Sequence, residues 1–427
     1  MPPTADDETR RAIHAVWSIE SARLIAGLAR LVRDVGIAEE LAQDALVAAL
    51  EQWPAGGVPD NPGAWLMATA KHHAVNYLRR GTLLARKHQE LGRALEADHE
   101  SEGSETVERI IDGLEDDVGD DLLSLIFVAC HPVLSREARV ALTLRLLGGL
   151  GTDEIARAFL VGEPTIAQRM VRAKRTLSEA RVPFQVPRGA DRVPRLSSVL
   201  EVIYLIFNEG YAASAGDDHM RPALCEEALR LGRILAGLAP DEPEVHGLVA
   251  LMELHASRAG ARTGRSGEPV LLPDQDRSRW DQILLRRGLA ALEAARASGA
   301  GPGPYQLQAE ISACHTRALS ADETDWAHIV ALYEELARLI PSPIVHLNRA
   351  VATAMADGPT AGLAIIDSLR AEPALRDYHL LPAARADLLA KLGRLDEARA
   401  EFQRAAALTQ NARQREQLLA RASACAG

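Results

Sequence analysis

Apolar residues recur at α-helical spacing along most of this chain. Residues 13–32, 38–52 and 64–79 each read as one helix, and a loop rich in proline and glycine separates the last two over 54–62. In the second helix, one face carries the apolar residues Leu41, Ala45, Leu46, Ala49 and Leu50. The opposite face carries Glu39, Glu40, Gln43 and Asp44. The pattern predicts an N-terminal domain of amphipathic helices.

A second helical pattern, over residues 151–177, is typical of a helix-turn-helix. The first helix is expected over 153–160 and the turn at 161–162, and Pro164 suits the first turn of the next helix because its opening amides need no intrahelical partner. Buried positions are expected at Ile155, Ala156, Phe159, Ile166 and Met170. The outward face of the second helix carries Glu163, Thr165, Gln168, Arg169 and Arg172, followed by Lys174 and Arg175.

Such a second helix fits the major groove of DNA, where arginine and glutamine reach base edges or phosphates. An amphipathic helix hairpin with a solvated basic face is the alternative interpretation, since short helix-turn-helix patterns also arise by chance.

From residue 197 to 426 the chain reads as successive helices joined by short turns. The segment 391–408 has the spacing of a tetratricopeptide repeat, with Gly393 at the turn and Ala398 packed between helices, and 326–339 resembles the second helix of another repeat. These features predict an all-α protein whose C-terminal part is a helical solenoid, a surface that commonly binds a protein or peptide.

A segment rich in glycine, proline and charge interrupts these helices over 260–279 and predicts a long loop. Its charged residues suit either an interior salt-bridge knot or a recognition patch, and the IFNEGY motif near residue 208 poses the same choice. The possible regulatory patch comprises Asn208, Glu209, Tyr211, Asp274, Gln275, Asp276, Arg277 and Trp280. No histidine or serine accompanies these carboxylates in a catalytic pattern, so no catalytic residue is assigned and no enzyme activity is expected.

Charge is distributed unevenly along the chain. The 427 residues contain 48 Lys+Arg and 59 Asp+Glu, a net charge of −11. Residues 96–122 hold 1 basic and 12 acidic side chains, whereas residues 123–195 hold 12 basic and 6 acidic ones. The cationic excess therefore coincides with the helix-turn-helix, where release of counterions from DNA would favour binding.

The remaining composition argues for a reduced, non-membrane environment. The cysteines Cys130, Cys225, Cys314 and Cys425 are scattered without a CxxC pair, which disfavours disulfides and a cysteine-based metal site. No apolar run approaches the length of about 20 residues that crosses a bilayer. We therefore expect a cytoplasmic protein with no metal, cofactor or membrane partner.

Two segments resemble a known family. EELAQDALVAALEQW, followed after a Pro/Gly loop by NPGAWLMATAKHHAVNYLRR, resembles region 2 of an extracytoplasmic-function (ECF) sigma factor, and residues 120–177 resemble region 4. FNEGYAAS and LLPDQDRSRWD resemble the branch of that family with a long helical C-terminal extension. The resemblance implies region 2 over 10–82, an acidic linker over 83–121, region 4 over 122–186 and a tetratricopeptide-like domain over 195–427.

The resemblance also implies binding partners for particular residues. Contacts with the β′ clamp helices of core RNA polymerase fall on Glu40, Leu41, Gln43 and Asp44. Contacts with melted minus-10 DNA fall on Asn61, Trp65, Lys71, Asn76, Arg79 and Arg80, although a core position is also open for Trp65. Contacts with double-stranded minus-35 DNA fall on Glu163, Thr165, Gln168, Arg169, Arg172, Lys174 and Arg175, and the β flap is a further partner of region 4.

Two functions of different classes follow. The first is a promoter-specificity factor of bacterial RNA polymerase, with the solenoid as a built-in control element that also has a possible protein partner. The second is a DNA-binding repressor or adaptor whose solenoid senses a peptide, without polymerase contact. Only the region 2 resemblance separates them.

Overall fold

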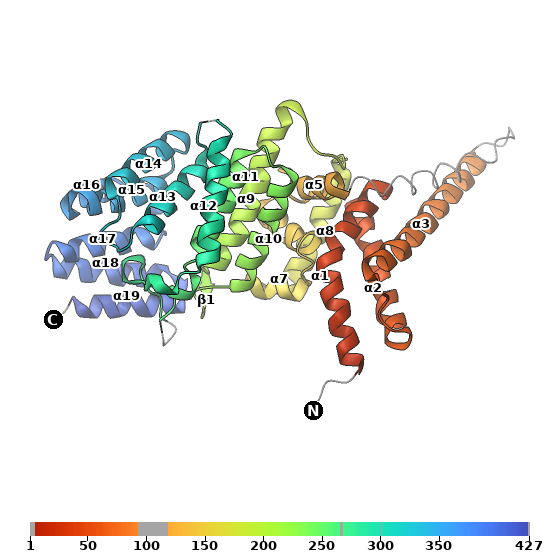
Figure 1. The fold of residues 1–427 in the computed structure, drawn as a ribbon, viewed down its shortest axis with the longest axis horizontal. Coiled ribbons are helices and arrows are strands. Elements are labelled where there is room, and N and C mark those ends of the chain that lie inside the picture. The colour runs from red at the N-terminus through yellow and green to blue at the C-terminus, as the bar shows by residue number, and fades with distance from the viewer. Residues whose placement is uncertain (1–4, 93–117, 265–267, 300, 426–427) are drawn as a thin grey trace. The chain divides into compact units, whose positions relative to one another are not determined.

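The computed structural model describes residues 5–92, 118–264, 268–299 and 301–425 (Figure 1). This part of the chain is almost entirely α-helical, and its strands are two residues long. The chain divides into two compact units, residues 1–202 and 203–427. The predicted all-α class is confirmed. The acidic residues 93–117 of the expected linker lie outside the described residues.

The first three helices of unit 1 pack against one another. They are α1 (Ala5–Val32), α2 (Val35–Gly56) and α3 (Pro62–Gly92). The side chain of Asp34 accepts hydrogen bonds from the amides of Gly36 and Ile37, and these bonds cap the start of α2. The loop expected from Pro54 begins later, because α2 continues past buried Trp53 to Gly56, and the next residue, Gly57, has a φ of 83° that suits glycine.

The second half of unit 1 contains four shorter helices. They are α5 (Val118–Ala129), α6 (Arg136–Leu146), α7 (Thr152–Ala158) and α8 (Glu163–Glu179). A 3-10 turn, η1 (Gly189–Asp191), leads into α9 (Arg192–Tyr211), whose residues up to 202 belong to unit 1. Arg195 donates a hydrogen bond to the carbonyl of Phe127, and Arg139 forms an ion pair of 3.0 Å with Glu201. The start of α9 is therefore fastened to α5 and α6.

Unit 2 is a succession of helices in which each packs on its neighbours in the chain. Its longer elements are α10 (Pro222–Leu238), α11 (Pro243–Ala256), α12 (Gln282–Ala297), α13 (Pro304–Arg317), α14 (Trp326–Leu339), α15 (Pro343–Asp357), α16 (Pro359–Ser368), α17 (Leu380–Lys391), α18 (Leu395–Leu408) and α19 (Ala412–Ala424). The 3-10 turns are η2 (Ala259–Ala261), η3 (Leu272–Asp274), η4 (Arg277–Arg279) and η5 (Pro373–Leu375). The helix predicted over 326–339 matches α14, and Ala398 is buried as expected.

The end of unit 2 is tied back to its beginning. Strands β1 (Ala215–Gly216) and β2 (Gln410–Asn411) pair in parallel. The Asn411 side chain is 0% exposed and donates hydrogen bonds to the carbonyls of Ala213 and Asp218. Because a buried amide without partners is costly, these bonds fix the β1 segment against β2.

Candidate nucleic-acid interface

Helices α7 and α8 form a helix-turn-helix at the predicted place. Ile155, Ala156, Ile166 and Met170 are buried between the helices, as expected. Helix α7 ends at Ala158 rather than at residue 160, because Leu160 adopts a φ of 50°, which lies in the left-handed region. The Gly162 carbonyl then accepts a hydrogen bond from the Thr165 amide, and α8 begins.

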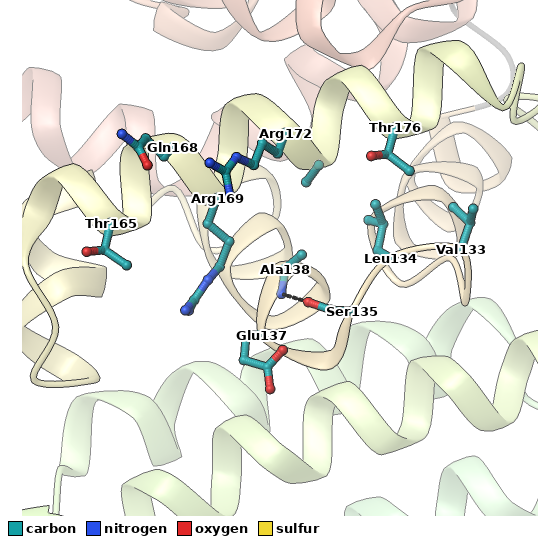
Figure 2. A pocket seen from close by; sticks show the side chains of 11 residues that line it. Val133, Leu134, Ser135, Glu137, Ala138, Thr165, Gln168, Arg169, Arg172 and Thr176 are labelled. Atoms are coloured by element: carbon teal, nitrogen blue, oxygen red, sulfur yellow. Dashed lines mark hydrogen bonds between the residues drawn. The ribbon is translucent and has the colours of Figure 1, made fainter.

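A groove of about 450 Å³ lies between α8 and the start of α6. Figure 2 shows the side chains of Thr165, Gln168, Arg169, Arg172 and Thr176 along α8 on one side of this groove. Ser135, which caps α6 by accepting from the Ala138 amide, lies on the other side with Glu137. The α8 side of the groove carries side-chain donors from Thr165, Gln168, Arg169 and Arg172, of the kind that bind an anionic backbone such as that of DNA.

Arg169 extends from α8 toward Glu137 of α6 (Figure 2). A hydrogen bond at its own backbone amide and the Ser135 hydroxyl lower the pKa of Glu137, and the charge of Arg169 lowers it further. Glu137 therefore stays ionised at neutral pH and attracts the guanidinium. This attraction orients Arg169 across the groove rather than straight outward from α8.

The cations at the far end of the predicted DNA-binding face are held by carboxylates. Arg175 forms an exposed ion pair of 2.6 Å with Glu179, one helical turn away. Lys174 forms an ion pair with Glu39 of α2. In contrast, Glu163, Thr165, Gln168 and Arg172 are exposed on α8. Helix α8 therefore has two polar edges: one is exposed, and the cations of the other are paired with carboxylates.

Glu39 is the centre of a second polar site, the Glu39 cluster, which comprises Glu39, Arg145 and Lys174. Arg145 Nε lies 2.7 Å from Glu39 Oε1, and the Gln43 side chain donates to the same oxygen at 2.8 Å. The Glu39 residue is only 3% exposed. The expectation that Glu39 lies on a solvent-facing side of its helix is therefore wrong, because α6 and α8 cover that position and supply two cations. Nothing in the local helical pattern signals this contact, whose partners are far apart in sequence.

The residues predicted for polymerase contact occupy two environments. Glu40 and Asp44 are exposed on α2, and Gln43 is half-buried beside Glu39. Leu41 is 7% exposed and belongs to the core of unit 1. Among these four residues, the structure leaves two carboxylates facing solvent on one side of α2.

The residues predicted for minus-10 DNA lie on or just before α3. Asn61 caps this helix, because its side-chain oxygen accepts from the Ala64 amide at 3.1 Å. Trp65 is half-buried, and its ring meets that of Trp53 edge to face with centroids 5.4 Å apart. Farther along α3, Lys71 and Asn76 are half-buried and Arg79 and Arg80 are exposed.

The residues of the possible regulatory patch all lie in unit 2. Glu209 forms a partly buried ion pair with Arg221, Tyr211 stacks on His255, and Trp280 is buried. Arg277 donates to the carbonyl oxygens of His315 and Ala318 at 2.5 and 2.6 Å. Asp276 instead caps η4 through the Ser278 amide.

Of the two interpretations of the 260–279 loop, the salt-bridge knot does not describe Arg277 and Gln275, whose side chains bond to backbone groups. Gln275 follows the same rule and donates to the carbonyl of Val270. Arg277 needs no carboxylate because the end of α13 presents carbonyls without intrahelical partners, and these accept hydrogen bonds from its guanidinium.

Two further features bear on function. The described residues contain no group of three or more His, Cys, Asp or Glu arranged to hold a metal ion. Among the described helices, none combines the length and apolar character needed to cross a membrane.

Comparison with known proteins identifies both halves of unit 1. Residues 19–83 match sigma-70 region 2, and residues 124–177 match sigma-70 region 4. Residues 195–296 match DUF6596, a family of unknown function. No solved structure matches the chain.

Relatives extend this comparison. An uncharacterised protein of Rhizobium meliloti is 42% identical over 388 residues, which are 91% of this chain and 90% of the relative. The probable ECF RNA polymerase sigma factor SigI of Mycobacterium tuberculosis is 25% identical over 181 residues, which are 42% of this chain and 59% of that relative.

The fold and the helix-turn-helix, together with these matches, define a sigma-70-type transcription factor. More narrowly, the chain belongs to the ECF sigma factors and carries a C-terminal DUF6596 extension. Its class has core RNA polymerase and promoter DNA as partners.

Proposed function

We propose that this ECF sigma factor directs RNA polymerase to promoters through two separate surfaces of unit 1, and that unit 2 controls their use. The observation that carries the proposal is the exposed polar edge of α8 above the α6 groove, within a segment that matches sigma-70 region 4. Thr165, Gln168 and Arg172 present donors and acceptors there at helical spacing. These groups suit base edges and phosphates of a minus-35 element.

The region 2 part of the proposal concerns α2 and α3. Exposed Glu40 and Asp44 on α2 suit a basic surface, for which the β′ clamp helices are the proposed partner, and Leu41 and Gln43 support that helix from within. The loop at Asn61 and the face of α3 with Trp65, Lys71 and Asn76 are proposed to hold melted minus-10 DNA, because unpaired bases need aromatic and cationic supports. Arg79 and Arg80 extend this face.

The regulatory part of the proposal concerns unit 2. Its consecutive helices offer a continuous surface of the kind that binds proteins or peptides. We propose that unit 2 is a regulatory domain within the same chain, and that the signal it receives determines whether promoters are used.

The β flap is the proposed polymerase partner of the region 4 part.

Run-off transcription with purified core polymerase tests the proposal directly. The full chain is compared with a chain ending at Tyr211, because ending at residue 195 would remove the Arg139–Glu201 ion pair from unit 1. Specific transcripts from the full chain support the promoter function, and the shortened chain gives the sign of the control by unit 2.

A matched variant separates the two candidate functions. Glu40→Lys together with Asp44→Lys reverses the exposed charge on α2 and leaves α8 unchanged. Loss of core-polymerase binding with retained DNA binding is expected. If the unaltered chain binds DNA but never core polymerase, the repressor or adaptor function replaces the proposal.

A further inference from the structure

Unit 2 holds a concentration of positive charge that no feature of the proposed function uses. We call it the arginine cluster, and it comprises Arg258, Arg262 and Arg277 with the imidazoles of His255 and His315. Arg258 follows α11 and is only 6% exposed. Within the described part of the chain its guanidinium forms no hydrogen bond or ion pair, and its Nε atom is buried without a partner.

The neighbours of Arg258 are held by groups that carry no negative charge. The guanidinium of Arg262 lies 3.6 Å from the centre of the Tyr211 ring and donates to the Tyr211 carbonyl. His255 stacks on the same ring, with centroids 5.1 Å apart. Arg277 donates to two backbone carbonyls and lies 4.8 Å from the Trp280 ring. Aromatic faces and carbonyl dipoles therefore hold these side chains without neutralising them.

The cations also act on one another. Burial and then Arg258 lower the pKa of His255 well below its usual 6.5, and the same two causes with Arg277 lower the pKa of His315 to about 4. Burial lowers the pKa of Arg262 and of Arg277, and the nearby charge of Arg258 lowers both pKa values further. Both histidines are therefore neutral at physiological pH, and the three guanidinium charges remain close together.

Three buried or partly buried acids of unit 2 are already engaged with other cations. Glu209 pairs with Arg221, Glu253 with Arg233, and Glu310 with Arg296. Glu323 attracts Arg277, but it is exposed and forms no ion pair with that residue among the described side chains. A buried charge is costly unless a counter-charge accompanies it. The arginine cluster lacks such a counter-charge within the described residues.

We propose that the arginine cluster is a binding site for a small anionic molecule, whose carboxylate or phosphate group is held by Arg258 with Arg262 and Arg277. A guanidinium offers five donors in a planar fork, which matches both kinds of oxyanion. Arg258 is buried, whereas Arg262 and Arg277 are partly exposed. The expected ligand of unit 2 is therefore negatively charged. Its binding involves unit 2 alone and does not depend on whether the chain binds polymerase.

Calorimetry and thermal unfolding of the full chain test the proposal, with inorganic phosphate and citrate as probes. Both are compared with sodium chloride at matched ionic strength. A saturable rise in Tm with at least one probe is expected. A response to phosphate alone indicates a phosphorylated ligand, and a response to citrate alone indicates a carboxylate ligand.

Arg258→Met is the decisive variant, and Arg279→Met is its matched control because Arg279 is an exposed arginine of the same loop. Arg258→Met is expected to weaken binding of the active probe by about tenfold or more, since charged hydrogen bonds are lost. Its Tm without probe is expected to equal or exceed that of the unaltered chain, because an unpaired buried charge is removed. The Arg279→Met variant is expected to bind normally.

Two results would overturn the proposal. The first is a Tm that responds to neither probe beyond the sodium chloride control. The second is a lower Tm for Arg258→Met with unchanged probe binding, which would make Arg258 a structural residue. If Arg258→Met does not fold, Arg262→Gln at the partly exposed edge supplies the same comparison, and retained binding in that variant argues against the site.

Discussion

Glu39 of α2 and Lys174 of α8 form a buried ion pair, although they belong to the segments that match sigma-70 regions 2 and 4. Arg145 joins the same carboxylate. The side chains of the two cations are about a quarter exposed, whereas that of Glu39 is 5% exposed. One carboxylate of the region 2 part thus pairs with two cations of the region 4 part, including one predicted to bind DNA.

Replacing the carboxylate is expected to release those cations. Glu39→Gln should lower the free energy of unfolding by about 1–3 kcal/mol, because Arg145 and Lys174 lose their counter-charge. It should also make DNA binding more salt-dependent, with a slope of log K against log salt that is steeper by about 1 for the freed Lys174. Urea titration and DNA binding at several salt concentrations measure the two effects. Glu40→Gln, one residue away and exposed, is the control.

Arg169 gives a second prediction, about promoter recognition. If its guanidinium reads a base, Arg169→Ala should weaken binding to the preferred minus-35 sequence by about 1–3 kcal/mol and relax preference at that position. Arg175→Ala should weaken binding only slightly, and equally for every sequence, because Arg175 already pairs with Glu179. Binding selection from a randomised duplex library measures both. An unchanged sequence preference in Arg169→Ala would refute the base contact.

Two glycines of unit 2 give a matched pair of stability predictions. A Cβ at Gly247 would lie 2.7 Å from the Gln306 amide nitrogen, where α11 and α13 approach closely. Gly247→Ala should therefore cost about 1–3 kcal/mol of stability through overpacking. A Cβ at Gly237 would meet nothing within 4 Å, so Gly237→Ala should be neutral or stabilising by up to about 1 kcal/mol. Denaturant unfolding of the two variants measures the difference, and equal effects would contradict the close approach.

The half-buried His315 predicts a loss of stability in acid. Burial, Arg258 and Arg277 lower its folded-state pKa from 6.5 to about 4, so the unfolded chain binds the proton more readily. The contribution of His315 is complete above about pH 6.5 and is lost as the pH falls toward about 4. His315→Gln should reduce the fall of Tm over this range. His328→Gln, at an exposed position of the same unit, should leave the fall unchanged.

Much of the helical fold of this protein could be predicted from its sequence. The 3.6-residue period placed α14 at 326–339, and small or apolar residues at the right positions identified the helix-turn-helix core at Ile155 and Ile166. These features are predictable because a helix and its buried face depend on residues only a few positions apart. The outward polar set on α8 followed from the same period.

The charge partners were decided by the tertiary structure alone. Glu39 was expected on a polar face, yet it is buried beneath Arg145 and Lys174. For Arg277 the sequence left a salt bridge and a recognition patch open, and the side chain binds backbone carbonyls. Arg258 carried no sequence signal and lies buried without a counter-charge among the described residues. Helical periodicity fixes the direction of a side chain from its own helix. Which charge it meets depends on helices brought beside it from distant parts of the chain.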